Sequence, residues 1–398
     1  MIRDMFKKRR VYLDYAAATP LSKVTVSAMQ LVMRESFANP SAIHTEGVKA
    51  RRLVENARKN IAKAVQIRPE FVTFTSGGTE SNNIAIIGLI EQLHNEGREY
   101  SDMEILTTNI EHPSVTNAVL SLKERGVHVK FISVKSDGRI NIDELKKNLT
   151  AKTVLLTLAY VNSEVGTIQP LHAIQKVLTE GEGIFSSKIF LHLDAAQAPL
   201  WVSCQFNSLG ADLVSFDFGK CNGPKGVGAL MRTARAVVSP VLFGGGQEAG
   251  VRSGTENVVS IVGGTIAFVE AQKHFKAVAE RVTKIRDEGI KHLLQLSDSI
   301  QLNGAEGSIR VANNINISLL GIDTEYLTIV LDAKGFAVST KSACAGAGGG
   351  ESVVVKELTN DSARATSTLR ITLGPETTPK NLAKLASTIQ KHLDSQSI

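Results

Sequence analysis

A glycine-rich turn at residues 75–80 of this 398-residue chain has the residue types of a phosphate cradle. The turn, TSGGTE, follows an apolar run and precedes a helical pattern, so backbone N–H groups and the positive end of a helix dipole would meet there. It lacks the lysine of a P-loop and the GxGxxG spacing of a dinucleotide-binding fold. The alternative is a tight turn in which Thr79 caps a helix.

Two further residues, Asp194 and Lys220, each follow an apolar run, KIFLHL and DLVSFDFG. A carboxylate at the end of a buried strand can hold a cationic ring nitrogen, and a buried lysine can form a Schiff base. The alternatives are a helix N-cap for Asp194 and a solvated surface side chain for Lys220. Together with the cradle, however, these residues meet the three requirements of pyridoxal 5′-phosphate (PLP): an imine partner, a pyridinium partner and a phosphate site.

The elements that must position these residues are short apolar runs alternating with helical patterns between about residues 20 and 260. The runs predict strands at residues 71–75, 104–108, 127–134, 153–161 and 188–194. Their hydrophobicity is continuous rather than alternating, which favours a parallel sheet covered on both faces. The fold class predicted is therefore α/β, with a mostly parallel sheet between helices.

After residue 255 the pattern changes to one long helix, residues 258–296, followed by short strands and a C-terminal helix. We expect three parts: residues 1–20 as an N-terminal segment that joins the small domain, residues 21–270 as a large cofactor-binding α/β domain, and residues 271–398 as a small α+β domain.

Composition and charge exclude several classes of protein. The longest nearly uncharged stretch, residues 258–269, is too short to span a bilayer, and Asp14 lies where a signal peptide needs an apolar core. The net charge of +6 suits small anionic ligands, and the basic quartet at residues 7–10 is expected to be a solvated tail rather than a nucleic-acid arm. Three widely spaced cysteines predict neither a disulfide framework nor a zinc site, and favour a cytoplasmic protein.

Ten segments in constant order, from about residue 11 to residue 374, resemble the cysteine desulfurase family, and in particular its NifS/IscS-like branch. The segments are YLDYAAATP (12–20), FANPSAIHTEGVKAR (37–51), FTSGGTESNNIAI (74–86), IEHPSV (110–115), YVNSEVGTIQP (160–170), LDAAQA (193–198), GPKGVGAL (223–230), GGGQEAGVRSGTEN (244–257), SAC (342–344) and STLRITLG (367–374). The resemblance implies a class V aminotransferase with the PLP-dependent type I fold. It also implies conversion of L-cysteine to L-alanine, with the sulfur passed on for iron–sulfur clusters or tRNA thiolation.

The same resemblance implies roles around the cofactor ring. Lys220 would bind PLP covalently and later remove the substrate Cα proton. Asp194 would pair with the pyridine nitrogen, and Gln197 would hydrogen-bond the phenolic oxygen. His112, in IEHP, would stack on the ring and take part in proton transfer rather than being only a structural histidine.

Further roles follow from the resemblance at the edges of the site. Gly78 and Thr79 would bind the phosphate, and Asn162 would contact cofactor and substrate. Thr255 resembles the residue that reaches the phosphate from a neighbouring subunit, which implies a homodimer. Arg370 would hold the substrate α-carboxylate, because a guanidinium can make two parallel charge-assisted hydrogen bonds.

Cys344 is the expected sulfur acceptor. It lies in the run SACAGAGGG, which is too rich in Gly and Ala to pack a core and is expected to form an exposed, mobile loop. A thiolate there could take sulfur as a persulfide and pass it to an acceptor protein. Cys204 and Cys221 lack such surroundings and are expected to be packing residues. A hydrolase using Cys344 with His112 is an alternative, but it leaves Lys220 unexplained.

Three residues depart from the family pattern. The family has Ser-x-His-Lys at the Schiff-base lysine, whereas this chain has Asp217, Phe218 and Gly219 before Lys220, and Ala249 replaces an arginine. A carboxylate ~4 Å from a phosphate costs about 4 kcal/mol per pair of unit charges at an effective dielectric constant near 20. Asp217 must therefore turn away, be protonated or bind another donor, although we expect PLP binding to persist.

Two other functions stay open at the level of sequence. A selenocysteine lyase or another type I PLP lyase would need the same residues except Cys344. A non-catalytic scaffold that binds a sulfur-acceptor protein is favoured only by the departures at Asp217 and Gly219. We expect no metal, no membrane partner and no direct nucleic-acid partner for any of the three.

Overall fold

The computed structural model describes residues 10–340 and 350–396. The strands are β1 (Val11–Tyr12), β2 (Val72–Thr75), β3 (Glu104–Thr108), β4 (His128–Ile132), β5 (Thr153–Ala159), β6 (Phe190–Asp194), β7 (Leu213–Asp217), β8 (Gly228–Arg232), β9 (Ile300–Leu302), β10 (Asn314–Leu319), β11 (Phe336–Ala337) and β12 (Thr368–Thr372). The helices are α1 (Lys23–Glu35), α2 (Thr45–Val65), α3 (Gly78–Asn83), α4 (Leu89–Asn95), α5 (Pro113–Glu124), α6 (Ile142–Asn148), α7 (Leu171–Phe185), α8 (Phe206–Leu209), α9 (Val258–Leu294), α10 (Thr324–Ala333), α11 (Val353–Thr359), α12 (Ser362–Thr366) and α13 (Pro379–Gln396).

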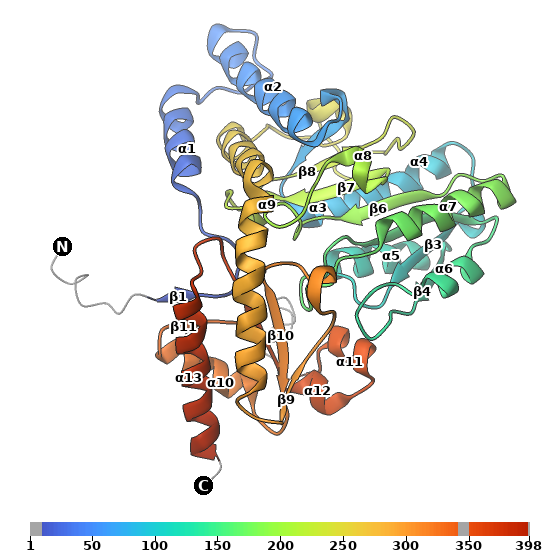
Figure 1. The fold of residues 1–398 in the computed structure, drawn as a ribbon. Coiled ribbons are helices and arrows are strands. Elements are labelled where there is room, and N and C mark those ends of the chain that lie inside the picture. The colour runs from blue at the N-terminus through green and yellow to red at the C-terminus, as the bar shows by residue number, and fades with distance from the viewer. Residues whose placement is uncertain (1–9, 341–349, 397–398) are drawn as a thin grey trace.

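The central sheet has seven strands in the order β2-β8-β7-β6-β5-β3-β4. The pairs from β7 to β4 are parallel, whereas β8 is antiparallel to both of its neighbours. This mixed, mostly parallel sheet between helices confirms the predicted α/β fold class (Figure 1).

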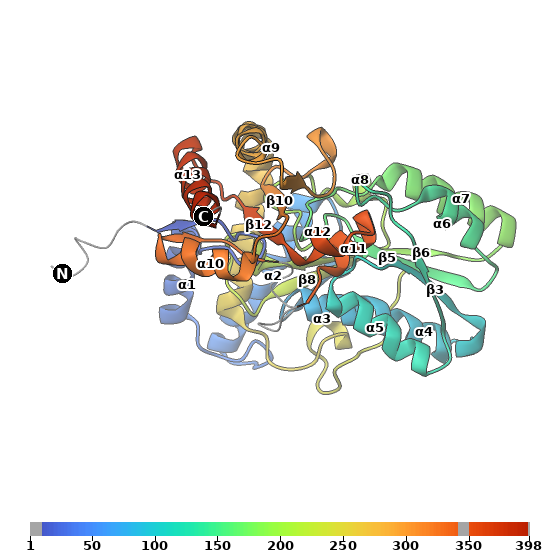
Figure 2. The ribbon, with the colours of Figure 1, turned by 90° about the horizontal axis from the view of Figure 1, so that it is seen from below.

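Helices cover both faces of the sheet, with α4 and α5 on one side and α6 and α7 on the other (Figure 2). Successive residues of β3, all of them buried, show why its sequence does not alternate between apolar and polar residues. Ile105 packs into the cluster that includes Val119 of α5, and Leu106 packs into the cluster that includes Ile174 of α7. Because both faces are buried, alternation of polar and apolar residues would be unfavourable.

The long helix α9 lies beside α1 and α2 at one end and contacts α13, β9 and β10 at the other (Figure 1). Here a second sheet pairs β12, β10 and β9 in antiparallel order. The predicted domain boundary near residue 270 falls inside α9 and stays a prediction.

The N-terminal segment joins the second sheet before it reaches the main one. Strand β1 pairs with β11, and the carbonyl oxygen of Leu13 accepts a hydrogen bond from the amide of Thr372. Arg10 forms an ion pair with Asp332 of α10, while the rest of the basic quartet lies outside the described residues.

The structure adds local details that were not predicted. The segment after Asp194 forms turns, so Asp194 caps no helix there, and residues 228–232 form the strand β8. The helix predicted after the glycine turn contains a π-helical segment, Ile84–Gly88, between α3 and α4. The neighbouring elements decide these details, because β8 completes its hydrogen bonds only between β2 and β7.

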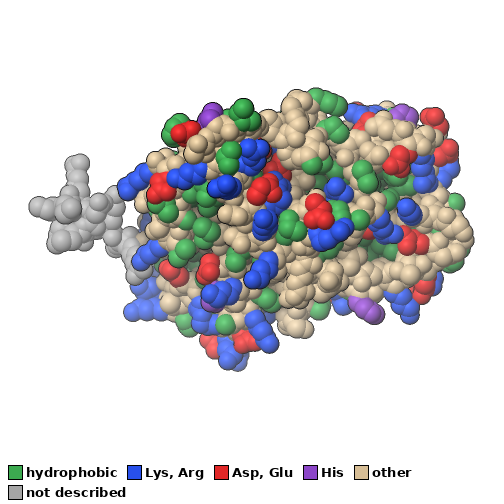
Figure 3. Space-filling view, turned by 90° about the horizontal axis from the view of Figure 1, so that it is seen from above, with side chains coloured by type: hydrophobic (Ala, Val, Ile, Leu, Met, Phe, Trp, Pro, Cys, Tyr) green, Lys and Arg blue, Asp and Glu red, His purple; other side chains and the backbone are tan. Residues whose placement is uncertain are grey.

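On the face seen in Figure 3, basic and acidic side chains are mixed with hydrophobic ones rather than separated by sign. None of the described helices combines the length and the apolar character that crossing a membrane requires.

Candidate active site

A cavity of about 260 Å³ lies at the carboxyl ends of the parallel strands. Asp194 is the last residue of β6, Lys220 follows β7, and Asn162 follows β5, so all three reach the same edge of the sheet. In open α/β sheets this edge is the usual place for a ligand. A larger cavity of about 670 Å³ lies elsewhere, beside Arg58 and Glu248, and contains none of the predicted site residues.

Lys220 lies in the short helical turn Phe218–Lys220 after β7. Its Nζ donates hydrogen bonds to the carbonyl oxygens of Ala16, at 2.9 Å, and Ala17, at 2.5 Å. Gln197 Nε2 donates to the same Ala16 oxygen at 2.9 Å. The N-terminal segment therefore forms one wall of the cavity and holds the amine of Lys220 inside it.

Asp194 is buried, and both of its carboxylate oxygens accept hydrogen bonds. Asn82 Nδ2 donates to Oδ2 at 2.8 Å, and the amide of Ala196 donates to Oδ1 at 3.0 Å. Asn82 also donates to the hydroxyl of Ser114 at 2.9 Å, while its Oδ1 is buried and has no hydrogen-bond partner among the described residues. Sequence reasoning missed Asn82, which fixes Asp194, because α3 is 112 positions away in the chain and only the fold brings them together.

His112 is the N-cap of α5, and its Nδ1 accepts a hydrogen bond from the amide of Ser114 at 3.1 Å. Accepting that bond leaves Nδ1 without a proton, so the neutral ring carries its proton on Nε2. Burial lowers the pKa of His112, and the positive charge of Lys220 lowers it further, against the opposing effect of Asp194 and Asp217. The geometry favours a neutral imidazole that can exchange a proton at neutral pH.

Glu111, the residue before His112, is a second buried carboxyl beside Asp194. It accepts hydrogen bonds from the hydroxyl of Thr108 and the amide of Ala159, both at 2.6 Å. Burial raises the pKa of Glu111 to about 8, with a further contribution from the charge of Asp194. Glu111 thus links the ends of β3 and β5 as a mostly protonated acid at neutral pH. Nothing in its local sequence indicates this state.

The glycine turn also borders the cavity. Gly77 has φ 144°, a conformation that favours glycine, and Gly78 and Thr79 begin α3 and line the cavity. A Cβ on Gly78 would lie 3.4 Å from Cβ of Asp217, so the backbone and this side chain are close neighbours. Asp217 Oδ1 accepts a hydrogen bond from the amide of Gly219 at 2.8 Å, and Oδ2 accepts one from the amide of Gly78 at 3.4 Å. Of the three possibilities open from the sequence, the carboxylate takes backbone donors.

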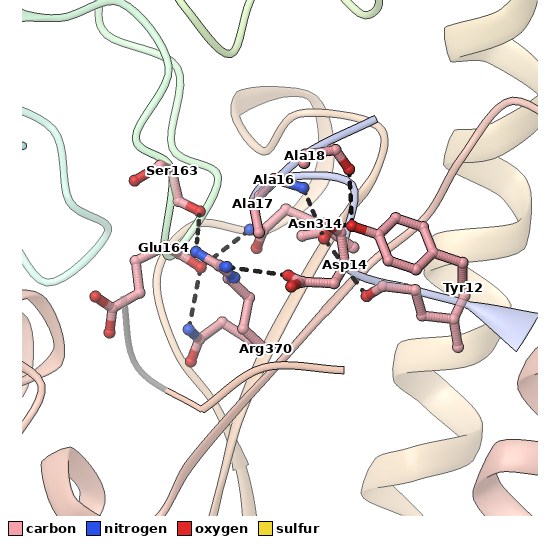
Figure 4. A network of polar contacts seen from close by, with 12 residues as sticks. Tyr12, Asp14, Ala16, Ala17, Ala18, Ser163, Glu164, Asn314 and Arg370 are labelled. Carbon is pink, nitrogen blue, oxygen red and sulfur yellow. Dashed lines mark hydrogen bonds and ion pairs between the residues drawn. The ribbon is translucent and has the colours of Figure 1, made fainter. Parts of the chain in front are cut away.

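Arg370, in β12, reaches the cavity from the second sheet (Figure 4). Its Nη2 pairs with Asp14 Oδ1 at 3.1 Å, and its Nη1 donates to the carbonyl oxygen of Ser163 at 3.2 Å. Its Nε is buried and, within the described part of the chain, has no hydrogen-bond partner. Burial raises the pKa of Asp14, against the attraction of Arg370. The buried guanidinium is thus held in place and keeps one donor for a further anion.

Three other predicted residues have different outcomes. Asn162 lines the cavity, but its side chain is already engaged by the protein. Its oxygen accepts hydrogen bonds from the amides of Glu164 and Val165, and its Nδ2 donates to the carbonyl oxygen of Ile110. Its contact with a cofactor therefore stays a prediction. Thr255 is exposed and does not line the cavity of this single chain. Cys344 lies outside the described residues.

The described chain on either side of residues 341–349 is attached next to the cavity. Ser339 exchanges two backbone hydrogen bonds with Arg370, and Ser352 donates its hydroxyl to the carboxylate of Glu164. The other two cysteines, Cys204 and Cys221, are buried, and burial raises the pKa of both thiols. A thiol that ionises with difficulty is a poor nucleophile, which agrees with the packing role expected for both.

Comparison with known proteins places the chain in a family. The family model described as aminotransferase class-V matches residues 11–385. The cysteine desulfurase IscS of Dictyoglomus turgidum is 37% identical over 375 residues, covering 94% of this chain and 92% of the relative, and IscS 1 of Archaeoglobus fulgidus is 34% identical over 374 residues, covering 94% of each.

Solved structures agree with these relatives. A structure described as a NifS-like protein superimposes with a TM-score of 0.88 at 30% identity, covering 97% of this chain and 99% of the other. A structure of SspA in complex with cysteine has a TM-score of 0.77 at 31% identity, covering 92% and 99%. The resemblance seen in the sequence is confirmed, and the chain belongs to the class V aminotransferase family, in its NifS/IscS-like branch.

Proposed function

We propose that this protein is a PLP-dependent cysteine desulfurase, which converts L-cysteine to L-alanine and transfers the sulfur to Cys344. The cysteine desulfurases among its relatives support this activity. The observation that carries the proposal is the meeting of Lys220, Asp194, His112 and Arg370 around one cavity, from four separate parts of the chain.

The residues of the cavity fit PLP. Two buried polar atoms, Asn82 Oδ1 and Arg370 Nε, lack partners in the described protein, and both belong to residues that line the cavity, as expected where ligand atoms complete the hydrogen bonding. Lys220 would hold the cofactor, Asp194 its ring nitrogen and the turn at Gly78 its phosphate. Bound PLP would act as an electron sink for the Cα carbanion of an amino acid. The negative charge of Asp217, which also lines the cavity, opposes this fit.

The protein residues then have distinct tasks. Arg370 would bind the α-carboxylate of cysteine and so fix the orientation of Cα toward Lys220, whose amine removes the Cα proton. His112, kept neutral by burial, would exchange a proton with the substrate at Nε2. In the net reaction, the C–S bond of cysteine breaks and an S–S bond to Cys344 forms. The thiol protons are retained in the methyl group of alanine and the persulfide, so no external oxidant is needed.

A homodimer, a sulfur-acceptor protein and a cytoplasmic location complete the proposal. Support for the dimer comes from Phe37, Ile43 and Phe243, which are 85%, 93% and 85% exposed in a single chain, far more than large apolar side chains usually are. Thr255 is exposed and outside its own cavity, which suits a residue that serves a neighbouring subunit.

The test adds L-cysteine to PLP-loaded protein and measures alanine together with persulfide on each cysteine by mass spectrometry. We expect alanine formation, persulfide on Cys344, and loss of at least 100-fold of the turnover in Cys344→Ala. Cys204→Ala is the matched control, because Cys204 is buried, and it should keep its turnover. Undiminished turnover of Cys344→Ala would favour a lyase instead, and binding of an acceptor protein without any alanine would favour a scaffold.

A further inference from the structure

Asp217 lies where the cofactor phosphate is expected, and its hydrogen bonds show what it does there. Its Oδ2 faces the first amide of α3, Gly78 N, at 3.4 Å, and is 3.6 Å from the position that a Cβ on Gly77 would take. Its Oδ1 is held by the amide of Gly219 at 2.8 Å. Among the described residues, the carboxylate accepts from backbone amides and makes no ion pair.

This geometry sets a carboxylate and a phosphate in competition for the same donor. The amide of Gly78 has one hydrogen, so a phosphate oxygen can use it fully only if Asp217 gives it up. The two groups are both anions, and their repulsion is not relieved by a cation paired with Asp217 in the described structure. Gly219 adds no side chain that could donate to the phosphate in compensation.

We propose, on the basis of the proposed PLP-dependent function, that Asp217 is an internal competitor of the cofactor phosphate that makes cofactor binding weak and readily reversible. The competition would act on the phosphate, because the amide that Asp217 engages, Gly78 N, belongs to the turn expected to hold the phosphate. The protein would therefore exchange PLP with free cofactor on a short time scale.

The test compares two ligands that differ only in the phosphate, PLP and pyridoxal, in equilibrium titrations of apoprotein followed by the absorbance of the bound cofactor. The variants are Asp217→Ser and Asp217→Asn. Both remove the charge, and both keep an oxygen that can accept from the amide of Gly219. Asp323→Ser is the matched control, because Asp323 also accepts hydrogen bonds from backbone amides, at the start of α10, away from the cavity.

We expect both Asp217 variants to lower the dissociation constant of PLP at least tenfold, equivalent to about 1.4 kcal/mol, with that of pyridoxal changed less than twofold. Release of PLP should slow by a similar factor. Asp323→Ser should leave the dissociation constants of both ligands unchanged. Equal PLP affinity in wild type and both variants, or an equal change for both ligands, would overturn the proposal. A different result would count against the desulfurase function alone: Asp217→Ser would bind PLP tightly but would form no alanine from cysteine.

Discussion

Replacement of Glu111 by glutamine measures how the carboxyl of Glu111, beside Asp194, changes the free energy of unfolding with pH. The pKa of Glu111 rises from 4.5 to about 8 on folding, mainly by burial. Because the folded-state pKa is raised, its contribution to stability is complete below about pH 4.5 and is lost as the pH rises through about 8. At 1.36 kcal/mol per pKa unit, the free energy of unfolding should fall by about 2 kcal/mol between pH 6 and pH 8 through this group alone.

Glutamine reproduces the protonated acid at this position. Its oxygen can accept from the amide of Ala159, and its amide group can donate to the hydroxyl oxygen of Thr108. Glu111→Gln should therefore keep the fold but remove the pH-dependent loss. Its stability relative to wild type should increase by about 2 kcal/mol from pH 6 to pH 8.

Denaturant titrations of both apoproteins at several pH values measure this difference. Glu124→Gln, at the exposed end of α5, is the control and should show the same pH dependence as wild type. A constant difference between Glu111→Gln and wild type across this range would refute the reasoning, because it would mean that Glu111 does not change its protonation.

Two further substitutions test other parts of the structure. Arg370→Lys should raise the KM for cysteine about 10- to 100-fold with a smaller change in kcat, because lysine cannot make the paired hydrogen bonds of a guanidinium to a carboxylate. Initial-rate kinetics measure both constants, and an unchanged KM would show that Arg370 does not bind the carboxylate. Arg58→Met should lower the free energy of unfolding by about 3–5 kcal/mol, because Glu248 would lose its charge partner. The carboxylate of Glu248 accepts hydrogen bonds from both Nη atoms of Arg58 at 2.7 Å, and its side chain is only 2% exposed. A loss below 1 kcal/mol in denaturant titrations would contradict a buried ion pair.

The fold was largely predictable because its strands are buried on both faces. The runs that contain β3, β5 and β6 have no regular alternation of polar and apolar residues, and that signal survives in the sequence without any tertiary information. Strand β8 was missed, since it follows a glycine-rich turn and is defined mainly by its two antiparallel neighbours.

The residues of the candidate site also differ in whether the sequence could predict them. Asp194 and Lys220 could be found because each stands at the end of a predicted strand. Asn82, Glu111 and Asp14 could not, since their importance comes from contacts with Asp194 or Arg370 that the fold creates. Thus most of the residues expected to touch the ligand were named from the sequence, whereas Asn82, which also lines the cavity, and the positioning residues Glu111 and Asp14 were not.

The central claim, that Lys220 carries the cofactor in the cavity beside Asp194, is tested most directly by reduction with borohydride after PLP loading. Reduction fixes the cofactor to the amine that holds it, and peptide mapping then identifies that residue. The account predicts one label per chain, on Lys220, and no stable label in Lys220→Ala. A label on another lysine in wild type, or none at saturating PLP, would contradict it.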